Sequence, residues 1–378
     1  MFPMKFLRMA LAIALLLPAA SGWADDGATE SNLKVSGFLS VVGGNVIGGK
    51  LDGNYSGTPQ INGANCPCYT ADWSNGGVYD NNFSLKPESH AGIQATYSFN
   101  QTVNFTGQVV TRATDATPNV QWAYLGVKLS DDWDLHLGRQ RIPLYYYSPF
   151  QDIGTAYPWV SPPPELYGWE ATNYNGASLR YRTSVGDNNI AASVFAGQER
   201  VSDSLYYRLY YNSDTVVTWK SLVGADVEVN NGPLTVRAVY LQAKARDVND
   251  AYAIDSTANL KAYGVAANLD MDKWFVLTEF TRLSRDYGNY TETSPAFTVG
   301  AGVRLGKWTP FLNFASYIDQ TSNIDLYAPQ SYRRSSFTLR YDVDASSDVK
   351  AQVDHNVDAT DNYGGTVNVF RISYDRVF

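Results

Sequence analysis

Apolar and polar residues alternate with a period of two in sixteen separate runs between Leu33 and Phe378. In the run 297–305, for example, Phe297 and Val299 alternate with Thr298 and Gly300. This period predicts β-strands with one mostly apolar face and one polar face. The predicted strands are 33–46, 88–99, 102–112, 119–129, 133–142, 173–183, 189–199, 216–229, 233–246, 259–270, 274–284, 297–305, 308–319, 333–343, 348–356 and 367–378.

The segments between these strands are alternately short and long. Short turns are expected at 100–101, 130–132, 184–188, 230–232, 271–273, 306–307 and 344–347. Longer loops are expected at 47–87, 113–118, 139–172, 200–215, 247–258, 285–296 and 320–332. A meander with tight turns at one end and long loops at the other is the layout of an outer-membrane barrel, whose short turns face the periplasm. The sequence therefore predicts an all-β fold, a 16-stranded antiparallel transmembrane β-barrel.

A soluble β-sandwich would also have alternating strands, so the barrel rests on two further observations. The polar faces carry arginine and glycine, without the bulk needed to pack against a second sheet. Aromatic residues fall at strand ends, where a membrane barrel has its interfacial girdles. These residues are Tyr97, Trp133, Trp219, Trp274, Trp308 and Tyr374. Both observations favour the barrel.

The first 24 residues have the order of a secretory signal peptide. Lys5 and Arg8 precede an apolar stretch at 9–20, and small residues follow at 22–24. This order predicts cleavage after Ala24, which leaves residues 25–378 as the barrel domain. After Ala24 no apolar run approaches the roughly 18 residues that a transmembrane helix needs.

Charge and cysteine content narrow the function further. The net charge is −8, and loss of Lys5 and Arg8 makes the exported chain more acidic, so a nucleic-acid partner is not expected. Cys66 and Cys68 are the two cysteines of the chain. In an exported protein a disulfide between them is favoured over a metal site, because two thiols alone bind metal poorly.

The long third loop has an unusual composition. Six prolines lie between Arg139 and Gly168, and they exclude a helix or a central strand. Seven aromatic residues share this interval, whereas disordered segments are poor in aromatics and rich in charge. We therefore expect the loop to fold into the mouth of the barrel, with Tyr157 packed on the wall, and to set the width of the pore.

Three stretches resemble the trimeric Gram-negative porins of gammaproteobacteria. They are the first strand KVSGFLSVVGG (34–44), the Gly138-Arg139 start of the third loop, and the loop sequence DIGTAYPWVSPPPELYG (152–168). The resemblance implies a homotrimer in the outer membrane, a third loop that folds inward, and Asp152 and Glu165 as the acids of that loop. The final strand ends on Phe378, which resembles the signature read by the barrel assembly machinery.

The basic residues expected to face the loop acids are drawn from the polar phases of the strands. Arg139 and Arg141 stand at the start of the loop, and Arg180 and Arg182 follow it on the next strand. Acids on the loop that face arginines on the wall create a transverse field in a pore. Further lumen-wall arginines are Arg237, Arg304, Arg340 and Arg371. The alternative, that some of these arginines form structural ion pairs, stays open.

These features predict an outer-membrane porin, a passive diffusion channel for small hydrophilic solutes and ions that needs no enzyme site, metal or cofactor. His90, His136 and His355 match no metal-ligand spacing, and G-x-S-x-G is absent from the sequence. Three alternatives remain. One is a channel specific for a sugar or an anion, in which Tyr145 to Tyr147 would contact the substrate. The others are a barrel enzyme and a surface adhesin or receptor, the last using loops 47–87 and 320–332.

Overall fold

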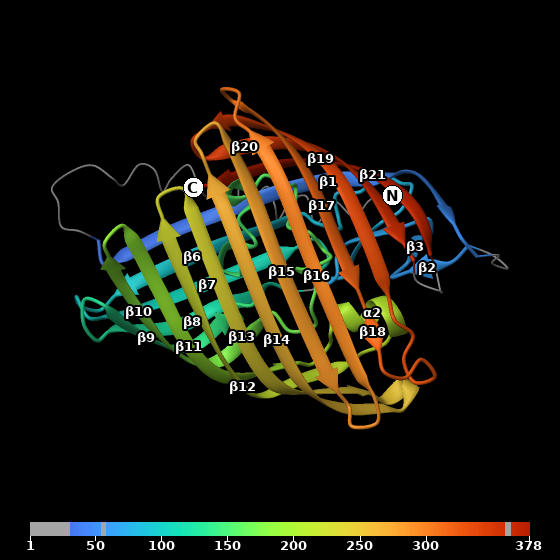
Figure 1. The fold of residues 1–378 in the computed structure, drawn as a ribbon, viewed down its shortest axis with the longest axis horizontal. Coiled ribbons are helices and arrows are strands. Elements are labelled where there is room, and N and C mark those ends of the chain that lie inside the picture. Colours follow the sequence, from blue (N-terminus) through green and yellow to red (C-terminus); the bar gives the residue numbers. More distant parts are fainter. Residues whose placement is uncertain (1–30, 54–57, 116, 360–363) are drawn as a thin grey trace.

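The computed structural model describes residues 31–53, 58–115, 117–359 and 364–378, so the expected signal peptide at 1–24 lies outside the described residues. Sixteen strands form one antiparallel barrel (Figure 1). The barrel closes because β1 pairs with β6 near its start and with β21 over the rest of its length. The barrel strands are β1 (Leu33–Leu51), β6 (His90–Ser98), β7 (Val103–Arg112), β8 (Asn119–Lys128), β9 (Trp133–Arg141), β10 (Asn173–Val185), β11 (Asn188–Val201), β12 (Val216–Asn231), β13 (Leu234–Asn249), β14 (Ile254–Asp270), β15 (Trp274–Asp286), β16 (Thr291–Val303), β17 (Trp308–Ile318), β19 (Ser331–Asp344), β20 (Ser347–Asp358) and β21 (Gly365–Val377).

Each of the sixteen predicted runs corresponds to one of these strands, and the predicted fold class is confirmed. Most differences lie at the ends next to the long loops. The run predicted at 297–305 is the strand Thr291–Val303, and the run at 259–270 begins already at Ile254. These extensions carry polar residues such as Thr291 and Thr293, so the apolar signal that marks the strand in the sequence is lost there.

The two faces of each strand differ as the alternation predicts. On β16 the side chains of Phe297, Val299 and Val303 are exposed on the outside of the barrel. Thr298 and Gly300 point to the interior, where Thr298 is almost completely buried. The outer surface is therefore an apolar band, and the polar phase lines the lumen.

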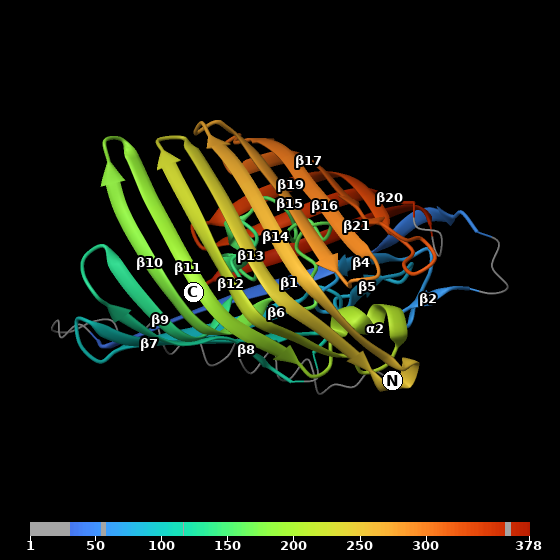
Figure 2. The ribbon, with the colours of Figure 1, turned by 60° about the horizontal axis from the view of Figure 1, so that its bottom comes forward.

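Within the part of the chain that the structure describes, helical structure is confined to short segments. The helix α2 (Leu205–Tyr211) lies in the loop between β11 and β12, at the end of the barrel that carries the β2–β3 hairpin (Figures 1 and 2). Ser204 caps its first turn by accepting a hydrogen bond from the Tyr207 amide, and Asn212 ends it in the left-handed conformation. Within the described ranges, no helix has the length and apolarity to cross a membrane.

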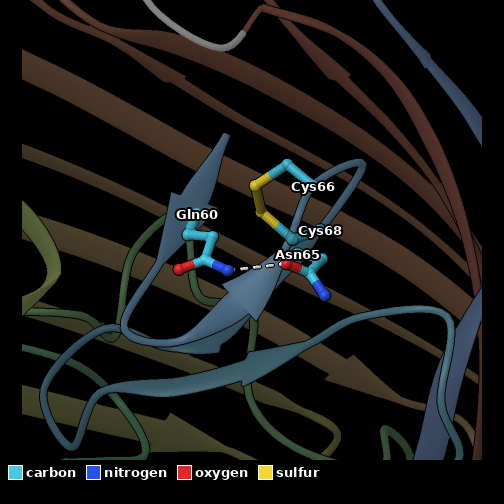
Figure 3. Close-up of a disulfide and its surroundings, with 4 residues drawn as sticks. All are labelled: Gln60, Asn65, Cys66 and Cys68. Carbon is cyan, nitrogen blue, oxygen red and sulfur yellow. Dashed lines mark hydrogen bonds between the residues drawn. A yellow bond between two sulfur atoms is a disulfide. The ribbon is translucent and has the colours of Figure 1, made fainter. Parts of the chain in front are cut away.

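The first loop, L1 (52–89), contains two small hairpins. These are β2 (Gln60–Ile61) with β3 (Ala64–Asn65), and β4 (Tyr69–Asp72) with β5 (Gly77–Tyr79). A disulfide joins Cys66 and Cys68 beside the first hairpin (Figure 3). Tyr69 and Tyr79 pack against Val367 and Val369 on the inner face of β21. L1 therefore folds into the barrel mouth, which its sequence alone did not indicate.

Candidate pore constriction

The third loop, L3 (142–172), lies inside the barrel. It contains two short 3₁₀ turns, η1 (Ser148–Phe150) and η2 (Gly154–Ala156), and is otherwise irregular. Its aromatic side chains belong to the main buried cluster together with inner-wall residues of β13, β14, β15 and β17. Trp159, for example, is 1% exposed and its ring meets that of Phe311 on β17 edge to face at 5.3 Å between centroids. The apolar composition of L3 is thus explained by contact with the wall.

Asp152 ties L3 to one side of the barrel. One carboxylate oxygen lies 2.5 Å from a guanidinium nitrogen of Arg112 at the end of β7, and the other accepts a hydrogen bond from Arg141 at the end of β9. Burial alone would raise the pKa of Asp152, but the two guanidinium groups outweigh it and hold that pKa well below its usual range. The carboxylate is therefore ionised at neutral pH.

Glu165 ties L3 to the wall formed by β19 to β21. Its carboxylate accepts from Nε of Arg334 at 3.0 Å, and Arg334 also donates to Asp354 on β20 at 2.8 Å. Arg371 on β21 completes the cluster, since it contacts Asp354 at 2.9 Å and Glu88 of L1 at 2.7 Å. Acidic and basic groups alternate along this cluster, so each buried charge lies beside a charge of opposite sign. A buried charge without such a partner would be strongly destabilising.

A third acid ties the end of L3 to the long strands. Glu170 accepts from Arg285 on β15 at 2.7 Å and from the indole nitrogen of Trp219 on β12 at 3.3 Å. Arg285 also donates to Glu292 of β16 at 2.9 Å. Two more buried carboxylates, Asp247 and Asp319, interact electrostatically with this group. Four carboxylates therefore surround a single guanidinium group.

Cationic side chains of the wall also donate hydrogen bonds to backbone carbonyl groups of L3. Because the loop has little secondary structure, its carbonyl groups need other donors inside the barrel. Arg237 of β13 donates to the carbonyl of Tyr145 at 2.9 Å, and Arg340 of β19 donates to the carbonyl of Thr155 at 2.9 Å. Lys350 of β20 donates to the carbonyl of Gly154 at 2.6 Å. These contacts fix the path of the loop from wall to wall.

Several predicted site residues meet in this arrangement. Asp152, Glu165 and Arg141 form ion pairs, and Tyr157 is 2% exposed with its hydroxyl donating to the carbonyl of Gln151 at 3.0 Å. Arg237 and Arg340 contact the loop backbone, and Arg371 contacts the hydroxyl of Ser161 in the loop. Tyr145 and Tyr147 are buried, so they pack the loop against the wall.

Other predicted residues lie elsewhere. Arg182 was expected to face the loop acids, but it pairs with Asp134 near the short-turn end. Arg180 lies opposite Asp134 in the sheet register and forms no ion pair with any described residue. The expected pairing with Asp152 and Glu165 is wrong, because Asp152 pairs with Arg112 and Arg141, and Glu165 pairs with Arg334. Arg139 pairs with Glu199 of β11, and Arg304 pairs with Asp270 beside the short turns.

Arg141 was among the expected residues, but the two other arginines that hold the loop acids, Arg112 and Arg334, were not identified from the sequence. Arg334 lies on the same inward face of its strand as Ser336, two residues further along the chain. Continuing the polar alternation of Ser336, Thr338 and Arg340 back by two residues would have placed Arg334 on the lumen wall. Arg112 ends β7, and nothing in its own run distinguishes it from a residue at a solvent-exposed strand end. The role of Arg112 is apparent only in the structure, where L3 folds back against β7 and places Asp152 beside it.

A cavity of about 550 Å³ lies on the short-turn side of L3. Tyr146, Phe150 and Tyr157 of the loop form one side, and Phe275 and Arg304 lie on the opposite side. On the other side of L3 the mouth is partly filled by L1 and α2, where Trp73 contacts the rings of Tyr206 and Tyr210 of α2 at 6.2 and 6.0 Å between centroids. L3, L1 and α2 therefore all occupy the interior on the long-loop side of this cavity. Among the described residues, no group of three or more His, Cys, Asp or Glu side chains is placed to hold a metal ion.

Comparison with solved structures defines the fold. The outer membrane channel DcaP of Acinetobacter baumannii gives a TM-score of 0.61 at 12% sequence identity, covering 94% of this chain and 100% of that chain. The anion-selective porin from Comamonas acidovorans gives 0.57 at 12% identity, with 92% and 99% covered. The trimer form of OmpT, an outer membrane protein of Vibrio cholerae, gives 0.55 at 13% identity, with 92% and 99% covered.

The chain therefore has the fold of the 16-stranded outer-membrane porins. At these identities the likeness concerns the fold. No protein-family model and no curated protein sequence matches the chain.

Proposed function

We propose that this protein is an outer-membrane diffusion channel for small hydrophilic solutes and ions, and that L3 forms its constriction. The observation that carries the proposal is the path of L3, which is tied to β7 through Asp152, to β19 through Glu165 and to β15 through Glu170. A loop held on three sides of a closed barrel narrows the lumen at a fixed level. Its charged anchors then set the field that a permeating solute meets.

The charge balance of the interior favours cations. The cluster around Arg285 contains four carboxylates, as described above. Around Arg237 lie three acids, with Asp226 at 3.6 Å and with Glu228 and Glu279 close enough to interact. Carboxylates also outnumber bases around Arg340 and Lys350, which share Asp342, Asp348 and Asp375. A lumen with excess negative charge concentrates cations and repels anions.

A channel specific for one class of solute is the second candidate. The outer mouth combines the ring of Trp73 with those of Tyr206, Tyr210 and Tyr332. Rings beside carboxylates fit either a sugar or an organic cation. Saturable solute flux in liposomes would favour this second candidate over general diffusion.

We also propose a homotrimer. The outer face of β1 exposes Leu33, Val35 and Val41, which make a smooth apolar surface for barrel-to-barrel contact. β6 continues this surface with Ile93 and Tyr97. Native mass measurement in mild detergent tests this, and a purely monomeric protein would refute it.

The channel proposal is tested by planar-bilayer recording in a tenfold salt gradient. We expect a cation-selective reversal potential for the native protein and a higher conductance after deletion of residues 145–166. A matched control removes residues 323–326 from the loop before β19, which lies outside L3, and should leave conductance unchanged. If deletion of the L3 segment leaves conductance at the native value, L3 is not the constriction and the proposal is wrong.

A further inference from the structure

His90 is the first residue of β6, and its side chain lies between L1 and L3. The Nδ1 atom of the ring lies 2.8 Å from the carbonyl oxygen of Glu88 at the end of L1. The Nε2 atom lies 2.9 Å from the carbonyl oxygen of Asp152 in L3. A single imidazole ring therefore contacts the backbone of both loops that fold into the barrel.

Both partners of the ring are carbonyl oxygens, which accept hydrogen bonds and cannot donate them. A neutral imidazole has one N–H group and one nitrogen lone pair, whereas an imidazolium has two N–H groups. The distances of 2.8 Å and 2.9 Å are both hydrogen-bond lengths. With a neutral ring, one lone pair would face a carbonyl oxygen at this distance. The arrangement therefore needs a proton on each ring nitrogen.

The contact with Asp152 fixes the backbone of L3 at the residue whose side chain is already bound. The carboxylate of Asp152 pairs with Arg112 and Arg141, and His90 adds a donor to the carbonyl group of the same residue. Asp152 is 7% exposed, and a buried carbonyl group that loses its donor is destabilised. His90 therefore contributes to holding this part of L3 in place.

The two contacts of the ring differ in how far they reach along the chain. Glu88 precedes His90 by two residues, and its carboxylate is held separately by Arg371 at 2.7 Å. The contact with Asp152 spans 62 residues. A neutral ring keeps one N–H group, and the local contact with Glu88 orders less of the chain than the distant one. Loss of the ring proton should therefore break the contact with L3.

The charged groups around His90 are paired with one another. They lie on L1, L3, β7, β9, β20 and β21, and the ring of Phe38 on β1 meets the His90 ring edge to face at 6.2 Å between centroids. Since each charge has an opposite partner, the two carbonyl contacts decide which form of the ring fits. The acids are Asp72, Glu88, Asp152 and Asp375, and the bases are Arg112, Arg141, Arg371 and Lys350.

We infer that His90 is a positioning residue of the constriction and that its imidazolium form joins L1 to L3. This inference rests on the proposed function for its effect on ion current. When the ring proton passes to water, Nε2 becomes an acceptor that faces the carbonyl oxygen of Asp152. L3 is then held at this residue by the carboxylate alone, and the segment around Asp152 fluctuates more.

The first test detects the two ring N–H groups. The untagged native protein is labelled with ¹⁵N in its histidine rings, and heat-modifiability on gels verifies folding. The chain has three histidines, so His90→Gln, His136→Gln and His355→Gln assign every ring signal. At about pH 5.5 we expect His90 to show two N–H protons protected from exchange with water, and at about pH 9 only one. His136 is the internal control, because its buried Nδ1 has no hydrogen-bond partner in the described chain.

The second test measures the effect on L3 through single-channel current in planar bilayers. Between about pH 6 and about pH 9 the native channel should show at least about threefold more brief current fluctuations, because one hydrogen bond to the loop is lost. His90→Gln should show equal fluctuations at both values, since an amide does not titrate. His355→Gln is the matched control and should keep the native response, because His355 is exposed on β20.

A single protected N–H group on His90 at about pH 5.5 would overturn the inference. A native pH response in His90→Gln would also overturn it, because another group would then control the fluctuations. Failure of the channel proposal gives a different result. A folded barrel that shows both protected N–H groups but carries no ion current contradicts the channel proposal alone. A barrel whose conductance rises on deletion of the L3 segment, but whose His90 shows one protected N–H group, contradicts the His90 inference alone.

Discussion

The Nε atom of Arg334 lies 3.0 Å from a carboxylate oxygen of Glu165, which joins the wall strand β19 to L3 across 169 residues of sequence. Arg334 is completely buried and Glu165 is 6% exposed. Asp354 holds the same guanidinium group at 2.8 Å from the neighbouring strand. The contact therefore fixes the far side of the loop to a rigid element, and its loss has consequences for both stability and conductance.

Replacing Arg334 by methionine should destabilise the barrel strongly. The substitution leaves Glu165 buried without a cation, and removal of one partner from a buried pair costs about 3–5 kcal/mol. Glu165→Gln should cost less, because Arg334 keeps Asp354. Urea unfolding followed by gel mobility measures both effects. Arg333→Met is the matched control, since Arg333 is the exposed neighbour on the same strand, and equal losses at 333 and 334 would contradict this account.

Arg180 and Arg182 should have unequal effects on ion selectivity. Arg182 is already neutralised by Asp134, whereas Arg180 forms no ion pair within the described chain and contributes its full charge to the lumen. Arg180→Gln should raise the cation-to-anion permeability ratio, by roughly twofold, and Arg182→Gln should change it less. Reversal potentials in a tenfold salt gradient give both ratios. A larger change for Arg182→Gln would show that the ion pair is not formed in the open channel.

The barrel could be predicted from the sequence because each strand carries its own local signal. On β16, for instance, the alternation of Phe297 and Val299 with Thr298 and Gly300 needs no information from other strands. Turn lengths then give the meander order and the end at which the long loops lie. The position of L3 inside the barrel followed from composition, since its proline and aromatic content excludes both a strand and a solvated loop.

Apart from Arg141, the partners of the loop acids could not be predicted in the same way. Asp152 meets Arg112 across 40 residues and Glu165 meets Arg334 across 169, so both contacts depend on how the loop turns inside the lumen. Sequence proximity favoured Arg180 and Arg182, but Arg182 pairs with Asp134 of the neighbouring strand β9, and neither arginine pairs with a loop acid. The inward fold of L1 was missed for a related reason. Its Gly/Asn-rich composition resembles a surface loop, and its anchors Tyr69 and Tyr79 become significant only beside Val367.

Asp319 should make the properties of the outer mouth depend on pH. Burial raises the pKa of this loop carboxyl from 3.8 to about 6, and the nearby Glu292 adds to the shift. Ser294 donates a hydrogen bond to it at 2.9 Å, and the Tyr327 hydroxyl donates a second one. Because the folded-state pKa is the higher one, this group stabilises the fold below pH 3.8, and that stabilisation is lost as pH rises through about 6.

Two measurements check this prediction. The native barrel should lose up to about 3 kcal/mol of stability from this group between pH 4 and pH 7, at about 1.36 kcal/mol per pKa unit. Its cation preference should rise over the same range as the carboxylate ionises. Asp319→Asn should reduce both pH dependences, whereas Asp325→Asn, at an exposed position in the same loop, should leave them unchanged. A native pH profile retained by Asp319→Asn would assign the titration to another group.

Gly37 and Phe378 form the last contact that closes the barrel, and we expect both to be needed for assembly. Their backbones exchange two hydrogen bonds, at 2.8 Å and 3.0 Å. The Phe378 ring lies over Gly37, where an added Cβ would come within 2.2 Å of a ring carbon. A larger residue at 37 must therefore displace the ring from the seam between β1 and β21. An unpaired edge is not tolerated in lipid, so weaker closure should reduce the yield of inserted barrel.

Gly37→Val and deletion of Phe378 should each lower the amount of heat-modifiable barrel in outer-membrane fractions, by severalfold relative to the native protein. Lys34→Gln provides the control, because Lys34 is an exposed side chain on the same strand and lies outside the proposed trimer surface. Phe378→Tyr should restore near-native yield, since it keeps the ring over Gly37. Native yields for Gly37→Val would show that the ring contact is dispensable. A low yield for Phe378→Tyr with a normal yield for Gly37→Val would instead indicate that the terminal residue acts through recognition by the assembly machinery and not through packing.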